Sequence, residues 1–199
     1  MRKAMLYIHG KGGSSKEIEQ LKPFCEDYDF HGIDLSDFTP WGTEEQIQNA
    51  FEMLQRKYDS VSVVGNSIGA YCSMFALQNR SAEKAFFISP ILDMEKLILD
   101  MMMWANVTES ELQKLGTIHT DFGETLSWEY LTFVREHPIH WKTPTEILYA
   151  EYDNMTARKT VDDFVNTHQA NLTVMPKGEH WFHTPEQVAF LGKWLKSVC

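Results

Sequence analysis

The segment Val61-Ser62-Val63-Val64-Gly65-Asn66-Ser67-Ile68-Gly69 starts as an apolar, β-branched run and continues into a helical pattern over residues 70–77. This order predicts a strand, a sharp turn and a helix, with Ser67 at the apex of the turn. Such a turn strains the serine backbone, and glycines at positions 65 and 69 remove the collisions that larger side chains would cause. The pattern G-x-S-x-G is that of a nucleophile elbow, so Ser67 is the first candidate functional residue.

On both sides of this segment, short apolar runs alternate with helical patterns, which predicts repeated βα units and a parallel sheet. Strands are expected at about residues 4–8, 28–34, 61–64, 84–89, 145–150 and 171–175. Helices are expected to begin near Ser14 and Thr43 and to cover about 70–77, 157–167 and 184–196. Several of these starts carry the capping-box spacing of Ser or Thr followed three residues later by Glu or Gln. The fold class predicted is therefore α/β.

Residues 91–141 interrupt the alternation. This region is rich in Met and Trp, has a capping box at Thr108 and Glu111, and has a second helical pattern over about 127–136. It is interpreted as a mostly helical insertion between two strands of one domain that spans residues 1–199.

Composition limits the classes of partner. A chain of 199 residues with 43% apolar and 23% charged residues is typical of a soluble globular protein. Its net charge of −10 argues against nucleic acid or an anionic membrane as a partner. No run approaches the ~20 apolar residues of a membrane span. The three cysteines, Cys25, Cys72 and Cys199, are few and widely spaced, which predicts free thiols in a reducing cytoplasm.

A serine nucleophile needs a base, and the base needs a carboxylate that orients it. His180 follows the last expected strand, and Asp153 follows the strand at 145–150. The carboxyl ends of parallel strands share one edge of the sheet, where open α/β sheets place their sites. Ser67, His180 and Asp153 are therefore predicted to act as nucleophile, base and orienting acid. His183 is the alternative base, and Asp93 is the alternative acid.

The negative charge that develops on an attacked carbonyl oxygen needs two N–H donors. The backbone of Ile68, the residue after the serine, is expected to supply one. The loop His9-Gly10-Lys11-Gly12-Gly13-Ser14 is expected to supply the other, with Lys11 as the first candidate and Gly12 as the second. His9 is expected to brace this loop.

These motifs, in this order, resemble the α/β-hydrolase fold family over nearly the whole chain. The resemblance implies a three-layer αβα sandwich with a mostly parallel sheet, although the two antiparallel strands that usually come first are missing. It also implies that the insertion at 91–141 is a small helical cap that shapes the substrate pocket. Met102, Trp104, Trp128 and Trp181 are the expected pocket residues.

The resulting hypothesis is a serine hydrolase that cleaves a small carboxylic ester or thioester, part of it apolar, through an acyl-enzyme. Neither a cofactor nor a metal is expected, since the His180-x-x-His183 pair lacks a third ligand at zinc spacing. Two alternatives stay open. One is hydrolysis of a carbon–carbon bond, because Asn precedes the serine as in hydrolases of ring-fission products. The other is a non-catalytic protein that binds a small ligand. The sequence does not specify an oligomeric state.

Overall fold

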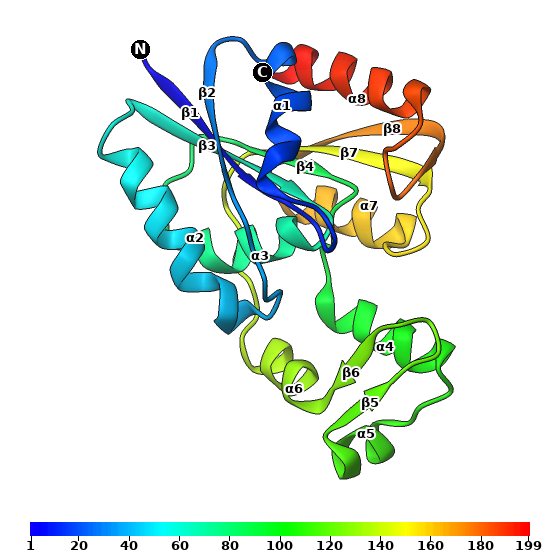
Figure 1. The fold of residues 1–199 in the computed structure, drawn as a ribbon. Coiled ribbons are helices and arrows are strands. Elements are labelled where there is room, and N and C mark those ends of the chain that lie inside the picture. Colours follow the sequence, from blue (N-terminus) through cyan, green and yellow to red (C-terminus); the bar gives the residue numbers. More distant parts are fainter. The chain divides into compact units, whose positions relative to one another are not determined.

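A six-stranded sheet forms the centre of the computed structural model, which describes residues 1–199. Its strands are β1 (Lys3–Ile8), β2 (Tyr28–Ile33), β3 (Ser60–Asn66), β4 (Ala85–Ile88), β7 (Thr145–Tyr152) and β8 (Ala170–Glu179). They lie in the order β2-β1-β3-β4-β7-β8, and every neighbouring pair is parallel (Figure 1). The predicted parallel sheet is confirmed.

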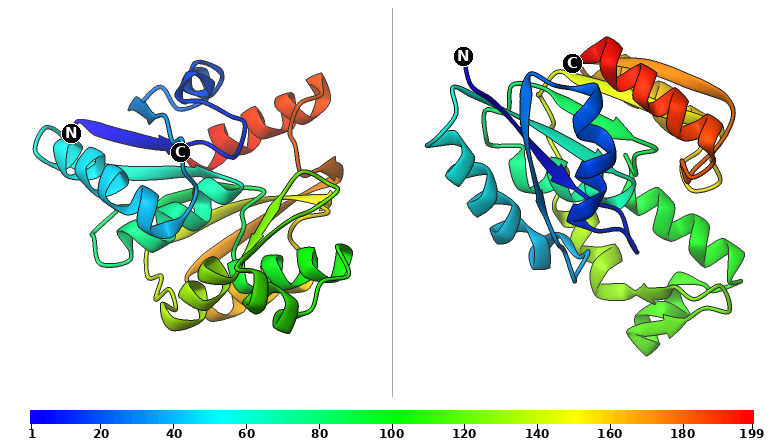
Figure 2. Two further views of the ribbon diagram at one scale, coloured as in Figure 1. Left: turned by 60° about the horizontal axis from the view of Figure 1, so that its bottom comes forward. Right: turned by 45° about the horizontal axis from the view of Figure 1, so that its top comes forward.

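Helices cover both faces of this sheet (Figures 1 and 2). One face carries α2 (Pro40–Gln55), α3 (Ile68–Leu77) and α7 (Arg158–Thr167). The other carries α8 (Pro185–Val198) and a short helical segment made of η1 (Ser15–Glu17), α1 (Ile18–Leu21) and η2 (Lys22–Phe24). The arrangement is the predicted three-layer αβα sandwich.

The strands at the centre of the sheet are buried on both faces, as parallel strands with helical cover usually are. In β1, every residue from Ala4 to Ile8 is at most 1% exposed. Successive side chains point to opposite faces. On the face of α1 and α8, Met5 and Tyr7 pack in one cluster with Leu21 and Trp194.

The start of α2 differs from the prediction. The helix begins at Pro40, and its N-cap is Thr39, whose side chain accepts a hydrogen bond from the N–H of Gly42 at 3.1 Å. Threonine at the N-cap with proline at the first helical position is a stronger start signal than a capping-box spacing alone. Thr43, the predicted start, lies inside the helix, and its hydroxyl donates to the carbonyl of Thr39 at 3.0 Å.

Residues Asp93–Ile139 form a separate compact unit, and Met1–Leu92 with His140–Cys199 form the other. The smaller unit contains α4 (Met94–Trp104), α5 (Glu109–Leu115), β5 (Thr117–His119), β6 (Thr125–Ser127) and α6 (Trp128–Glu136). Arg135 joins its helices by ion pairs to Glu95 at 2.6 Å and Glu109 at 2.8 Å. This unit lies within residues 91–141, where a helical insertion is expected, and its antiparallel β5–β6 pair was not predicted.

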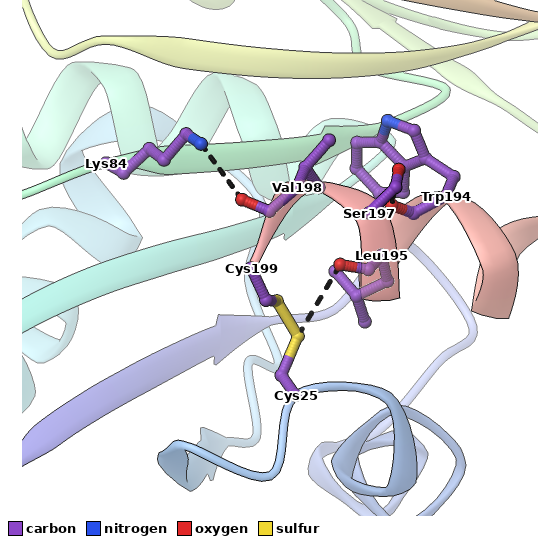
Figure 3. Close-up of a disulfide and its surroundings, with 7 residues drawn as sticks. All are labelled: Cys25, Lys84, Trp194, Leu195, Ser197, Val198 and Cys199. Atoms are coloured by element: carbon purple, nitrogen blue, oxygen red, sulfur yellow. Dashed lines mark hydrogen bonds between the residues drawn. A yellow bond between two sulfur atoms is a disulfide. The ribbon is translucent and has the colours of Figure 1, made fainter.

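The cysteine prediction is wrong for two of the three residues. Cys25 and Cys199 form a disulfide with a Cα–Cα distance of 5.7 Å, which ties the end of α8 to the residue after η2 (Figure 3). Nearby, the Lys84 ammonium donates to the carbonyl of Val198 at 2.9 Å. Cys72 is free and buried, and burial raises the pKa of its thiol to about 12. Because disulfides are rare in the cytoplasm, the cysteines no longer support a cytoplasmic location.

None of the helices has both the length and the apolar character that crossing a bilayer requires.

Candidate active site

The turn between β3 and α3 holds Ser67 in an unusual backbone conformation, with φ 52° and ψ −120°. A positive φ costs a non-glycine residue on the order of 1–3 kcal/mol, so neighbouring contacts must hold it. The N–H of Ser67 donates to the carbonyl of Ile88 at 2.9 Å, and its carbonyl accepts from the N–H of Ile91 at 3.1 Å. Backbone hydrogen bonds from the end of β4 and the segment after it therefore hold the serine turn in place.

Both glycines of the G-x-S-x-G pattern are required by close backbone contacts. A Cβ atom at Gly65 would lie 2.5 Å from the Cα of Ala70, and one at Gly69 would overlap the carbonyl oxygen of Ile8. The start of α3 therefore packs so closely against β1 and β3 that no side chain fits at either glycine. Ser67 consequently stands between the end of β3 and the first turn of α3, as the sequence predicts.

The three predicted residues Ser67, His180 and Asp153 lie in one hydrogen-bonded row. Ser67 Oγ is 2.9 Å from His180 Nε2, and His180 Nδ1 is 2.7 Å from Asp153 Oδ2. The Asp153 side chain is completely buried, and that of His180 is 18% exposed. A buried carboxylate that accepts from Nδ1 fixes the tautomer in which Nε2 accepts a proton from the serine hydroxyl.

The loop after β7 holds the Asp153 carboxylate in place. Its second oxygen, Oδ1, accepts hydrogen bonds from the N–H groups of Met155 at 2.8 Å and Thr156 at 2.9 Å. The Thr156 hydroxyl donates to the carbonyl of Pro90 at 2.9 Å, and the hydroxyl of Tyr149 donates to the Thr156 carbonyl at 2.9 Å. The carboxylate thus has hydrogen-bond partners on both oxygens, as a buried polar group requires.

An irregular stretch of β8 leads the chain to His180. Between Ala150 and Tyr152 of β7 the register with β8 shifts, and Lys177 adopts a positive φ of 56°. The N–H of Lys177 donates to Glu151 Oε2 at 2.7 Å. This bond across the two strands holds the irregular segment that ends one residue before His180.

The alternative residues have other partners. His183 Nδ1 lies 2.6 Å from the carbonyl oxygen of Trp181, and its N–H donates to Gln187 at the start of α8. Asp93 caps α4 by accepting from the N–H of Lys96 at 2.9 Å. The geometry therefore favours His180 and Asp153 over His183 and Asp93.

The loop at residues 9–14 lies against the serine turn. A Cβ atom at Gly10 would be 3.2 Å from both the Asn66 carbonyl oxygen and Ser67 Cβ. His9 Nε2 accepts from the N–H of Leu35 at 2.8 Å, so its Nδ1 carries the proton and donates to the Gly10 carbonyl at 2.7 Å. His9 thus braces the loop.

The same Gly10 carbonyl accepts from the N–H of Gly13 at 3.0 Å, and Gly12 has φ 79°, which together describe a type II turn. Because the peptide is planar and trans, a fixed Gly10 carbonyl also fixes the direction of the Lys11 N–H. Ile68 is the first residue of α3, where backbone N–H groups lack partners within the helix. The roles of Lys11 and Ile68 as oxyanion donors stay predictions.

The expected pocket residues are divided between the two units. Trp181 follows His180 and is 73% exposed. Met102 is buried in α4, Trp104 packs edge-to-face with Phe122 at a centroid distance of 6.2 Å, and Trp128 begins α6. The contribution of all four to a pocket stays a prediction. No three His, Cys, Asp or Glu side chains lie together in a way that could hold a metal ion.

The sequence reasoning missed the supports of the site. The backbone donors at Met155 and Thr156 carry a detectable signal, because an Asp that accepts from N–H groups two and three residues later is a common turn motif. The link from Glu151 to Lys177 has no sequence signal, since it depends on the strand register.

No family model matches the chain, and no curated protein sequence matches it. Several solved structures are similar to this chain in fold. Est1E from Butyrivibrio proteoclasticus, with ferulic acid bound, has a TM-score of 0.74 at 14% identity over 98% of this chain and 87% of its own. The mouse α/β hydrolase domain-containing protein 10 has a TM-score of 0.75 at 12% identity, and the match covers 98% of this chain and 88% of the mouse protein's. A lipase-esterase related protein from Clostridium acetobutylicum has a TM-score of 0.69 at 16% identity, and the match covers 99% of this chain and 94% of the other. The chain therefore has the α/β-hydrolase fold.

Proposed function

We propose that the protein is a serine hydrolase that cleaves a small carboxylic ester or thioester through an acyl-enzyme. The observation that carries this proposal is the row from Ser67 Oγ through the imidazole of His180 to the buried Asp153 carboxylate, with contacts of 2.9 and 2.7 Å. Ser67 and His180 are 113 positions apart in the sequence, and Asp153 and His180 are 27 apart. The serine also has a positive φ. Strained backbone together with a nucleophile–base–acid row is the arrangement that acyl transfer requires.

In the proposed mechanism, Ser67 Oγ attacks the carbonyl carbon while His180 Nε2 accepts the hydroxyl proton. Asp153 stabilises the imidazolium that forms. The N–H groups of Ile68 and Lys11 hold the oxyanion of the tetrahedral intermediate. When this intermediate collapses, His180 returns the proton to the departing alcohol or thiol, and the acyl group stays on Ser67. A water molecule that gives its proton to His180 then attacks the acyl-enzyme and releases the acid.

The proposed substrate is a small molecule with an apolar or aromatic part. The exposed Trp181 next to His180 supports this, and so does the structural neighbour Est1E, which binds ferulic acid. The net charge of −10 argues against nucleic acids and anionic membranes as partners. A cytoplasmic location was the expectation from the sequence, and the Cys25–Cys199 disulfide argues against it.

The test is intact-mass spectrometry after treatment with a fluorophosphonate probe, on wild type, Ser67→Ala and the control Ser197→Ala. Ser197 lies in α8, where its hydroxyl donates to the Trp194 carbonyl. We expect one adduct on wild type and on Ser197→Ala and none on Ser67→Ala. Folded wild-type protein without an adduct would contradict the proposal and favour a ligand-binding protein. A panel of esters, thioesters and a ring-fission-type carbon–carbon substrate then identifies the bond that is cleaved.

A further inference from the structure

A buried polar residue in β1 has no part in the mechanism described so far. Tyr7 is 1% exposed and packs among apolar side chains, yet its hydroxyl donates a hydrogen bond to Glu17 Oε2. Burial, together with the nearby Glu17 carboxylate, raises the pKa of Tyr7 far above its usual value, so the phenol stays protonated and remains a donor.

Glu17 extends this contact to the loop at residues 9–14. Its other oxygen, Oε1, accepts from the N–H of Ser14 at 3.1 Å. The carboxylate also lies directly against the loop, since a Cβ atom at Gly13 would overlap Oε1. One carboxylate therefore contacts both the core tyrosine and the end of the loop that is proposed to supply an oxyanion donor.

Tyr7 is connected to the strand before the serine turn through the sheet, because β1 pairs with β3 and Tyr7 lies opposite Val64. Asn66 is the last residue of β3 and directly precedes Ser67. The contacts Ser14–Glu17–Tyr7 and the pairing of β1 with β3 therefore connect the two segments that carry the proposed donors, Lys11 in the loop and Ile68 after the serine. A phenylalanine at position 7 would fill the same space without burying a hydroxyl, so simple packing does not account for the tyrosine.

We propose that Tyr7 and Glu17 are positioning residues that hold the 9–14 loop and the serine turn at a fixed separation, so that the two backbone donors face the same oxyanion. This inference rests on the proposed function. Its physical basis is that oxyanion stabilisation depends on donors at a defined distance from the developing charge. Loss of the connection lets the loop shift without removing either donor, and small misplacements are costly in catalysis.

The kinetic test uses Tyr7→Phe, Glu17→Gln and the double variant with a p-nitrophenyl ester. Each single variant should lower kcat by about 10- to 100-fold with KM changed by less than about 3-fold, as expected for contacts that act in the transition state. Because both residues belong to one chain of contacts, the double variant should lose little more than Tyr7→Phe alone. Additive losses, or a kcat equal to wild type, would overturn the proposal.

A matched control separates positioning from stability. Ile47, in α2, is fully buried and remote from this chain of contacts, so Ile47→Val should lower the melting temperature without lowering kcat at a temperature where it is folded. If Ile47→Val reduced kcat as much as Tyr7→Phe at an equal loss of melting temperature, Tyr7 would have only a structural role.

Hydrogen exchange gives a readout that does not depend on turnover. In Tyr7→Phe, amides of the 9–17 segment should exchange faster, while those of α2 should not. If wild type itself fails to react with the fluorophosphonate probe, the proposed function fails, and exchange alone then decides whether Tyr7 and Glu17 hold the loop. Unchanged exchange in Tyr7→Phe would overturn the inference even where the enzyme is active.

Discussion

The candidate site has two halves that are built differently. The serine half is local, because the strained turn and the two glycines that permit it lie within five consecutive residues, Gly65 to Gly69. The histidine–acid half is assembled from loops after two strands, and its geometry depends on the irregular register between β7 and β8. A candidate nucleophile can therefore be recognised from a short motif, whereas the candidate base and acid can be chosen among alternatives only when the strand order is known.

The largest expected effect comes from the base. His180→Ala should lower kcat by at least ~10³-fold, because it removes the proposed acceptor of the serine proton. His183→Ala should change kcat by less than about 3-fold, since the contacts of His183 are with the carbonyl and ring of Trp181 and with Gln187 near the start of α8. Steady-state kinetics on a p-nitrophenyl ester measures both. The opposite pattern would transfer the role of base to His183.

The acid should come next. In Asp153→Asn the amide nitrogen would face His180 Nδ1 and favour the tautomer with the proton on Nε2, which cannot accept a proton from Ser67. We expect kcat to fall by about 10²- to 10⁴-fold. Asp93→Asn is the matched control, because asparagine still caps α4. A large loss in Asp93→Asn with a mild one in Asp153→Asn would place the acid in the smaller unit.

The features that the sequence predicts are the local ones, as in the serine half of the site. The elbow, the individual strands of the sheet and the caps at Thr108 and Thr184 depend on residues close together in the chain, and the structure has them near the expected positions. The three-residue strands β5 and β6 are too short for a periodic pattern, so only tertiary pairing identifies them.

The sequence did not predict the contacts between residues that are far apart in the chain. Cys25 and Cys199 are 174 residues apart, and nothing local indicates that η2 and the end of α8 meet. Glu17 was recognisable as part of a capping box with Ser14, but its contact with Tyr7 depends on the packing of the η1–α1 segment over β1. Local signals predict elements, and contacts between elements require the fold.

Two glycine substitutions compare the halves directly. Gly69→Ala places a Cβ atom on the backbone of Ile8 and His9, which cannot move without displacing β1, so the free energy of unfolding should fall by about 3 kcal/mol or more. At Gly178, before His180, a Cβ atom would lie 3.1 Å from Cβ and Cγ of Met175 and 3.2 Å from its carbonyl oxygen. A shift of a few tenths of an ångström relieves these contacts, so the loss should be about 1 kcal/mol. Urea unfolding measures both, and equal losses would contradict the rigid, local character of the serine half.

The disulfide stabilises the chain end that follows the histidine half. Cys199→Ser should reduce the free energy of unfolding by about 2–4 kcal/mol, because the closed loop spans nearly the whole chain. Wild type in reductant should show the same loss, and kcat should stay unchanged below the melting temperature, since the hydrogen bonds that join Ser67, His180 and Asp153 involve neither cysteine. Thermal unfolding with and without reductant tests this. A reductant that leaves wild-type stability unchanged would show that the bond is absent in solution.

The smallest effect should come from Glu151, which connects the strands of the histidine half. Glu151→Ala removes the acceptor for the Lys177 N–H, and the irregular segment before His180 loses its contact across to β7. Because Ser67 and Asp153 still hold the imidazole on either side, kcat should fall by only about 3- to 10-fold with KM unchanged. Glu151→Gln keeps an acceptor oxygen and should restore most of the rate.

Glu146→Ala provides the control at the opposite end of the same strand. Glu146 pairs with Lys84 at 3.2 Å and accepts from Asn171, so its loss affects the contact between β7 and β8 without touching the segment before His180. Its kcat should equal that of wild type. If both alanine variants lowered kcat alike, β7–β8 pairing in general would support the site. A loss confined to Glu151→Ala would show that one carboxylate at the irregular register orients the base.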